Sequence, residues 1–286
     1  MTSLFGARMQ RFLPQRTLCR LIYLIARSRR RWIRAPLIAW FAKHYAIDLT
    51  QAELKHAGEY ESFNAFFTRA LEASARPIAG DAETLVSPAD GTLTERGRLS
   101  ADRMIQAKGM TYTLGELTGE PSERLAPFVD GSYATIYLAP YDYHRVHTPF
   151  AGRLVRTRYI PGRRYSVNAA SVAAIDRLFC RNERVVCWFE SALGPFAVTL
   201  VGALNVSSIS TATLGEIPSG APREWTADRG ADFAKGQELG RFNLGSTVIV
   251  LLPRDAVDWS DALHGGDTLL MGTAIGRARP RRGTPA

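Results

Sequence analysis

The N-terminal part of the chain alternates basic and apolar residues with the period of an α-helix. At about 100° per residue, the segment between Pro14 and Pro36 gathers five arginines in one narrow sector, and apolar side chains lie broadly opposite. Only Arg29 breaks this pattern. The spacing therefore predicts a basic amphipathic helix. Its arginines are Arg16, Arg20, Arg27, Arg31 and Arg34, and its apolar residues are Leu18, Leu21, Ile22, Ile25, Trp32 and Ile33.

The apolar runs of this segment are too short to span a membrane. A spanning helix requires about 20 apolar residues in succession, whereas the best runs here are 21–26 and 35–42. A basic amphipathic helix with Trp32 on its apolar side can instead lie in the headgroup region, where each cation near anionic lipid contributes about 1 kcal/mol. Two other interpretations stay open: a helix packed on the protein's own body with a solvated arginine face, and a mitochondrial presequence.

From residue 50 onward the pattern is first helical and then typical of strands. Apolar residues recur at three- and four-residue spacings as far as Arg76-Pro77, where a helix is expected to end. These residues are Leu54, Tyr60, Phe63, Phe66, Phe67 and Leu71. Beyond them, short runs punctuated by glycine and proline predict strands, with a turn at 193–195 joining two of them. The predicted strands are 133–138, 185–189, 196–204 and 247–252.

These patterns predict an α+β protein. We expect N-terminal helices, in a membrane-associating region over 1–75, followed by a β-rich catalytic domain over 76–286. The last ten residues, from 277 to 286, combine two prolines with four arginines and are expected to be disordered.

The net charge of +9 is concentrated at the N-terminus. Ten Lys or Arg and no acidic residue precede Asp48, while the rest of the chain is close to neutral. This distribution favours an anionic membrane surface over nucleic acid as the partner of the basic segment.

The cysteines argue for a reducing environment. Cys19, Cys180 and Cys187 are an odd number without the spacing of a disulfide framework, so we expect buried thiols in a cytoplasmic protein. No second Cys or His pair accompanies them, as a zinc site would require, and no metal is expected.

Three clusters place reactive side chains beside turn-forming residues. The first contains Asp90, in the sequence Ser-Pro-Ala-Asp-Gly, and the second contains His144 and His147 among two tyrosines and an aspartate. The third is Leu-Gly-Ser-Thr, with Gly245 and Ser246 directly before an apolar run. Taken singly, each has an ordinary interpretation, because Asp-Gly and Gly-Ser are common in turns. A bend between the flanking prolines would be needed for both histidines to face one site, since they would otherwise point to opposite sides of a strand.

In this order and combination, the clusters resemble those of the phosphatidylserine decarboxylase family of the bacterial type, and residues 244–247 look like its self-cleavage motif. The resemblance runs from about residue 60 to 253. Ser207, where glycine is expected, is a minor departure. The further matching segments are 63–64, 66–69, 76–77, 108–109, Phe179, 182–184, 201–203, 205–206 and 235–240.

The resemblance implies a self-processing enzyme. Asp90 would orient and charge His147, which would deprotonate Ser246 for attack on the Gly245 carbonyl. The resulting ester would break by elimination and leave a pyruvoyl group at position 246, together with two associated chains, 1–245 and 246–286. Decarboxylation leaves a carbanion that no ordinary side chain can delocalise, so a cofactor of this kind is required.

The resemblance also implies a substrate and a location. Phosphatidylserine would be converted to phosphatidylethanolamine on the cytoplasmic face of the inner cell membrane, by a peripheral protein whose sequence is compatible with a homodimer. His144 is our candidate for the group that protonates the product carbon. Arg163, Arg164 and Ser166 form the predicted contact for the lipid phosphate, although a solvated basic turn is an alternative.

Two other functions fit parts of the pattern. A serine hydrolase could use Asp90, His147 and Ser246 as a triad, in an order that one protease architecture uses, and it would keep an intact chain. Against this, Ser246 lacks a glycine two positions away on either side, which the nucleophile-elbow pattern has. A non-enzymatic lipid-binding module would explain the basic helix but would leave the three clusters without a purpose.

Overall fold

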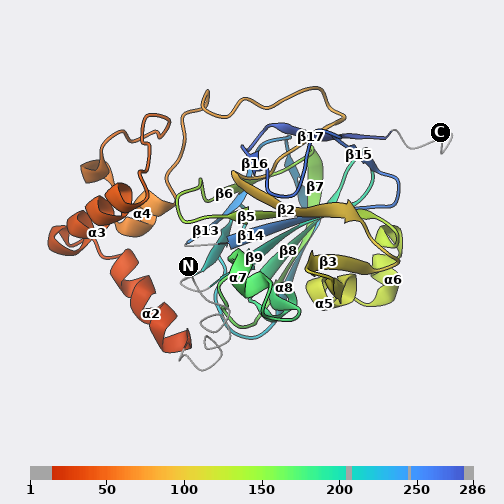
Figure 1. Ribbon diagram of the computed structural model, residues 1–286, viewed down its shortest axis with the longest axis horizontal. Coiled ribbons are helices and arrows are strands. Elements are labelled where there is room, and N and C mark those ends of the chain that lie inside the picture. Colours follow the sequence, from red (N-terminus) through yellow and green to blue (C-terminus); the bar gives the residue numbers. More distant parts are fainter. Residues whose placement is uncertain (1–14, 204–207, 244–245, 280–286) are drawn as a thin grey trace.

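The computed structural model describes residues 15–203, 208–243 and 246–279. Helices come first along the chain, and strands dominate the remainder (Figure 1). The α-helices are α2 (Gln15–Ala26), α3 (Arg31–His44), α4 (Phe63–Phe67), α5 (Leu114–Thr118), α6 (Ser122–Leu125), α7 (Ala169–Val172) and α8 (Leu178–Arg181), and the 3₁₀ turns are η2 (Ala57–Glu59) and η3 (Ala126–Phe128). The predicted α+β class is confirmed.

An antiparallel sheet forms the centre of the molecule, with eight strands in the described part of the chain. Their order across the sheet is β12 (Arg223–Phe233), β7 (Gly152–Ile160), β8 (Arg184–Glu190), β9 (Phe196–Gly202), β14 (Ser246–Leu252), β5 (Ser132–Leu138), β2 (Gly91–Arg98) and β16 (Thr268–Leu269).

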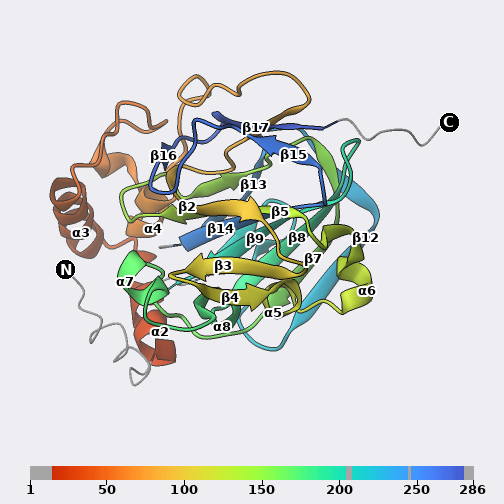
Figure 2. The same cartoon turned by 45° about the vertical axis from the view of Figure 1, so that its right-hand side comes forward.

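Smaller sheets flank this central sheet. One has the order β11 (Gly215–Glu216), β10 (Ile209–Thr211), β13 (Glu238–Phe242) and β6 (Arg145–His147). Another joins β1 (Thr84–Val86), β17 (Ala274–Ala278) and β15 (Val257–Trp259), and a hairpin consists of β3 (Arg103–Ala107) and β4 (Met110–Thr113). Figure 2 shows this hairpin in front of the central strands, near α5 and α8.

The four predicted strands are present and form adjacent positions of the central sheet. All residues of β14 and β9 are buried, because both faces of the sheet are covered. The predicted turn at 193–195 joins β8 to β9, and residue 204 of the predicted third strand lies outside the described residues. Arg277 and Ala278, predicted to be disordered, belong instead to β17, where Arg277 contacts Asp81 at 2.9 Å.

The single helix predicted between Pro14 and Pro36 is in fact two. The chain leaves helical geometry between α2 and α3, where Arg27 turns toward the body and donates to Glu216 at 2.6 Å. Pro36 does not end the second helix but lies inside α3. No described helix is long and apolar enough to cross a membrane.

The helical character predicted up to residue 75 is largely wrong. Only η2 and α4 form in this region, because the chain doubles back on itself: the Glu53 amide donates to the Ala70 carbonyl and the Glu72 amide to Gln51, both at 2.9 Å. The aromatic residues that produced the helical pattern pack on Phe41 of α3 instead. Phe41 lies 5.1 to 6.2 Å from the rings of Phe63, Phe66 and Phe67.

Two clusters of buried apolar side chains result. The larger one fills the β-sheet body, and the smaller one joins α2, α3 and α4 through residues such as Ala26, Ile38 and Phe66. In Figure 1 these helices lie to one side of the sheets. The division of the chain at residue 75 remains a prediction.

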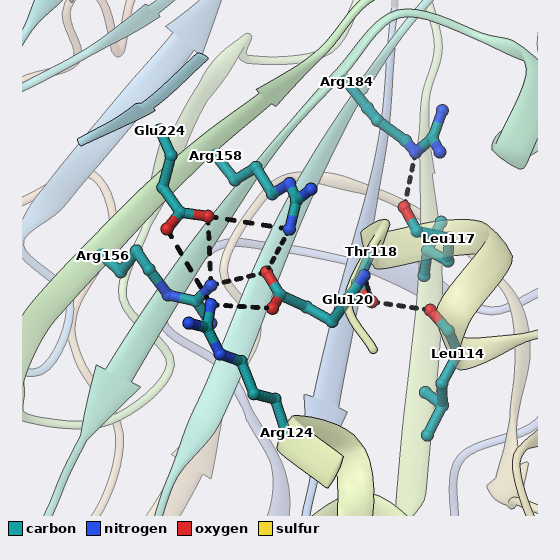
Figure 3. Close-up of polar contacts among 9 residues, drawn as sticks. All are labelled: Leu114, Leu117, Thr118, Glu120, Arg124, Arg156, Arg158, Arg184 and Glu224. Atoms are coloured by element: carbon teal, nitrogen blue, oxygen red, sulfur yellow. Dashed lines mark hydrogen bonds and ion pairs between the residues drawn. The ribbon is translucent and has the colours of Figure 1, made fainter. Parts of the chain in front are cut away.

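A buried network of charges fastens the α5–α6 segment to the edge of the central sheet (Figure 3). The Glu120 side chain is fully buried and lies 2.6 Å from Arg156 and 2.9 Å from Arg158, both on β7. Arg124 approaches the same carboxylate at 3.3 Å, and Glu224 of β12 lies 3.2 Å from Arg156. Burial alone would raise the pKa of Glu120, but the bonds and charges of Arg158 and Arg156 outweigh it and hold the pKa below its usual value.

Candidate active site

Ser246 is the first residue of β14, in the interior of the central sheet. Its backbone pairs with Leu138 at the end of β5 and with Gly202 at the end of β9. The side chain is fully buried, and within the described residues its Oγ has no hydrogen-bond partner. The hydroxyl is thus fixed in position by the sheet while remaining available for reaction. Leu244 and Gly245, on the other side of the predicted cleavage bond, lie outside the described residues.

Asp90 lies at the same end of the sheet, directly before β2. Strand β2 pairs with β5, the neighbour of β14, so Asp90 lies two strands from Ser246. A side chain at Gly91 would be impossible here, because a Cβ would lie 2.3 Å from the Tyr137 carbonyl oxygen. The Asp-Gly pair thus reflects a close approach of two backbones, which is a stronger constraint than an ordinary turn.

The Asp90 carboxylate is paired with Arg76. Arg76 donates to it from Nε at 3.0 Å and from Nη2 at 2.5 Å, and both side chains are largely buried. The Met271 amide also donates to Asp90, at 2.7 Å. Asp90 therefore connects the chain before the predicted cut to the chain after it.

His147 is held by two hydrogen bonds that fix its protonation. Its Nδ1 lies 2.8 Å from the Gly236 carbonyl, which can only accept, so Nδ1 carries the proton and Nε2 has the lone pair. The Tyr143 hydroxyl lies 3.1 Å from Nε2 and donates to it. Burial lowers the pKa of His147, although the Gly236 bond opposes this shift. The imidazole is consequently a neutral base whose basic nitrogen is Nε2.

His144 is fully buried and points its basic nitrogen into the protein. Its Nδ1 donates to the Asp142 carbonyl at 2.8 Å, while Nε2 has no partner. Its ring lies 4.0 Å from that of Phe67, and burial lowers its pKa to about 3. The His144 carbonyl accepts from the Phe242 amide at 3.0 Å, four residues before Ser246.

The bend that the flanking prolines allow brings the two histidines close to this end of the sheet. Strand β5 ends at Leu138, and the turn that follows is closed by Asp142, whose side chain accepts from the Ala139 amide at 2.7 Å. The His147 amide then donates to the Pro88 carbonyl at 2.7 Å, next to Asp90. Asp90, both histidines and Ser246 therefore gather at one end of the central sheet.

One contact differs from the predicted arrangement. Among the described residues, Asp90 and His147 share no hydrogen bond: Gly236 and Tyr143 orient the imidazole, and the Asp90 charge acts on it through space. Sequence reasoning noted Arg76 only as a family match and Tyr143 only as a member of a dense cluster. The Arg76–Asp90 pair is recognised from the structure, where a buried carboxylate lies beside an arginine to which no role had been assigned.

Two of the three predicted lipid contacts line a separate cavity of about 1420 Å³ between α2 and the body, and Ser166 is not part of its wall. Arg163 and Arg164 both contribute to its wall. Arg164 lies 2.6 Å from Glu183 in a buried ion pair, and Ser166 accepts from the Asn168 amide at 3.5 Å. A second cavity, of about 1030 Å³, is bordered by α4, β10 and β13. In the described part of the chain, no cluster of three His, Cys, Asp or Glu side chains could hold a metal ion.

Buried nucleophilic and basic side chains that gather at one end of a sheet are typical of the active site of an enzyme. The family model for phosphatidylserine decarboxylase matches residues 63–277, and a second model, described as PSD, matches residues 5–46. The chain belongs to the phosphatidylserine decarboxylase family, and the expected family resemblance is confirmed.

Similar proteins agree in name and in length. A protein of Ectopseudomonas mendocina is 45% identical over 94% of this chain and 96% of its own length. One of Nitrosococcus oceani is 45% identical over 94% and 89%, and one of Halorhodospira halophila is 47% identical over 93% and 91%. All three are named phosphatidylserine decarboxylase proenzyme, so the serine hydrolase alternative receives no support from them.

Proposed function

We propose that this chain cuts itself between Gly245 and Ser246 and then decarboxylates phosphatidylserine to phosphatidylethanolamine. The observation that supports this best is the Ser246 hydroxyl, which is fully buried, without a hydrogen-bond partner, at the start of a central strand. A buried hydroxyl without a hydrogen-bond partner lowers the stability of the fold. Such a group is expected where the hydroxyl takes part in a reaction. The pyruvoyl group made from Ser246 would supply the electron sink for loss of carbon dioxide.

His147 is the proposed base for self-cleavage. Its Nε2 is the atom that would take the Ser246 proton as Oγ attacks the Gly245 carbonyl, after the Tyr143 hydroxyl that occupies this lone pair has turned away. Burial favours the neutral form by lowering the pKa of His147, and the bond from Nδ1 to Gly236 leaves Nε2 as the basic nitrogen. Asp90, held by Arg76, would stabilise the imidazolium as it forms, through space rather than by direct contact.

His144 is the proposed proton donor to the product carbon. Because its pKa is lowered to about 3, it is neutral in the uncut chain and cannot begin as an acid. Nε2 would first accept a proton, for which the ammonium of the substrate is the natural source, and then return it to carbon. The fully buried position excludes water from this exchange. A His144→Ala chain that cleaves normally but decarboxylates at the wild-type rate would contradict this role.

The exposed faces of α2 and α3 support docking on a membrane. Trp32 and Trp40 are 71% and 58% exposed, and the α3 positions between them on the same face are alanine and proline. Several arginines instead face the protein: Arg27 contacts Glu216, and Arg34 donates to the Gly58 carbonyl at 3.2 Å. An apolar helix face directed outward suits the headgroup region of a lipid surface.

The remaining predictions complete this proposal. The enzyme would act as a peripheral protein on the cytoplasmic face of the inner cell membrane, with chains 1–245 and 246–286 associated. Retention of the second chain is supported by the pairing of β14 with β5 and β9 on either side. Arg163, Arg164 and Ser166 stay predicted lipid contacts, and a homodimer stays compatible with the fold.

The decisive experiment is the intact mass of the protein under denaturing conditions. We expect two fragments that meet at 245/246, the smaller about 17 Da lighter than a serine-initiated peptide because ammonia has been lost. Ser246→Ala should give one uncut, inactive chain. Ser132→Ala, which removes another buried serine at the opposite end of the β5–β14 pair, should cleave normally. An active wild-type protein with an uncut chain would overturn the proposal and favour the hydrolase.

A further inference from the structure

Arg69 is a buried cation without a counter-ion in the described part of the chain. The residue is only 6% exposed, and its Nε and Nη1 have no hydrogen-bond partner. Its remaining nitrogen, Nη2, donates to the Tyr141 carbonyl at 3.1 Å. An unpaired buried guanidinium is expensive, because desolvation disfavours the charge and each unsatisfied donor adds to the cost. Burial accordingly lowers the pKa of Arg69.

Three of the other arginines that line the 1030 Å³ cavity are already paired. Arg27 lies 2.6 Å from Glu216, Arg29 lies 2.9 Å from Glu61, and Arg145 lies 2.8 Å from Glu238. Arg69 lines the same cavity but has no such partner. Arg241, also in this wall, has no carboxylate partner among the described residues either, but it is only partly buried. Arg69 is therefore distinguished by being a buried cation without such a partner.

The position of Arg69 connects this cavity to the reactive groups. It follows α4, whose Phe67 contacts the His144 ring at 4.0 Å, and it bonds to the turn that precedes His144. One hydrogen bond and a contact with the Phe66 ring, at 5.9 Å from the ring centre, hold the guanidinium. A side-chain rotation that breaks no ion pair would direct its remaining donors into the cavity. The planar guanidinium can donate two parallel hydrogen bonds, and this geometry matches an oxyanion with two acceptor oxygens.

We propose that Arg69 binds the phosphodiester of the lipid headgroup and thereby positions the serine portion beside His144. This inference rests on the proposed function, and it assigns the phosphate to Arg69 as the alternative to the predicted contact at Arg163, Arg164 and Ser166. The carboxylate is the less suitable ligand, because an arginine paired with it would stabilise the ground state relative to the departing neutral carbon dioxide. The phosphodiester keeps its charge throughout the reaction. Arg164, in contrast, is already compensated by Glu183.

The test measures binding rather than turnover, in the uncut Ser246→Ala chain. Phosphorus NMR titration with glycerophosphoethanolamine, which has a phosphodiester and no carboxylate, should show saturable binding. Arg69→Gln should weaken this binding about 10-fold or more, since charge-assisted hydrogen bonds are lost. Arg69→Lys should be intermediate, because it keeps the charge without the fork. Arg29→Gln is the matched control: it removes an exposed cation of the same cavity and should change affinity less than about twofold.

Several results would overturn the proposal. These are no binding to the parent chain, equal binding by the parent and Arg69→Gln, or a loss produced by Arg163→Gln instead. A dependence of L-serine binding, but not of glycerophosphoethanolamine binding, on Arg69 would assign the residue to the carboxylate and refute the phosphodiester site. If Arg69→Gln does not fold, Arg69→Lys decides. The assay uses an uncut chain, so its outcome does not depend on self-cleavage. If the wild-type protein does not cut itself, the proposed function is refuted, but the measured binding to Arg69 remains valid.

Discussion

Glu120→Gln should destabilise the protein strongly, although it changes one oxygen to nitrogen far from the reactive groups. The Glu120 side chain is fully buried between Arg156 and Arg158, whose side chains are 14% and 27% exposed. Removing one member of a buried ion pair costs about 3–5 kcal/mol, since it leaves the other charge uncompensated. Glu224 remains within 3.2 and 3.6 Å of the two arginines and compensates part of their charge, so we expect a somewhat smaller cost of about 2–4 kcal/mol.

The pH dependence provides a second check. The pKa of Glu120 is lowered by folding, so its contribution is fully present above the unfolded value of about 4.3 and is lost as pH falls through the lower folded value. The difference in unfolding free energy between the two chains should therefore be constant near neutral pH and shrink below about pH 4.3.

Urea unfolding of the Ser246→Ala chain, with and without Glu120→Gln, measures this difference on a single covalent chain. Glu224→Gln is the control: that carboxylate is 34% exposed, and its loss should cost less than about 1 kcal/mol. A cost below 1 kcal/mol for Glu120→Gln, or a cost equal to that of the control, would refute the reasoning.

Two further predictions concern the base and the membrane. Tyr143→Phe should accelerate self-cleavage about 3- to 10-fold, because Tyr143 donates to the Nε2 lone pair that has to accept the Ser246 proton, and breaking this bond costs about 0.5–1.5 kcal/mol while Gly236 still holds the ring; an unchanged or slower rate, followed by gel densitometry, would contradict this. Replacing Trp32 and Trp40 by serine should weaken binding to anionic vesicles at least about 10-fold in a sedimentation assay. Ile105→Ser, which alters an exposed apolar residue of β3, should leave vesicle binding unchanged, and equal losses would argue against a helical docking face.

The strands were predictable because their cause is local. Runs such as 247–252 are β-branched and apolar, and a strand buried on both faces requires little more. The break between α2 and α3 was not predictable, because Arg27 turns toward Glu216, which lies 189 residues away. The helical prediction for 54–71 failed for a similar reason. Aromatic residues that pack on Phe41 have the same sequence spacing as the apolar face of one long helix, so the pattern could not distinguish the two.

The proposed reactive residues of the site come from the sequence, whereas their contacts come from the structure. The resemblance provided Asp90, His147 and Ser246, and the structure adds the partners that determine their state. His147 is oriented by the backbone carbonyl of Gly236, a contact that leaves no side-chain signal in the sequence. Arg69 likewise reads as a helix-end arginine until its burial and its lack of a partner are seen together.

The location of Ser246 at the beginning of an interior strand has a consequence for how the protein must mature. Strand β14 is hydrogen-bonded along its length to β5 and β9, so the fold has to be complete before position 246 is held for reaction. Once the chain is cut, loop closure no longer brings that strand to its neighbours, and refolding becomes an encounter between two separate molecules. The uncut chain is therefore the form that can reach this fold efficiently, and the mature enzyme persists by slow unfolding more than by its ability to refold.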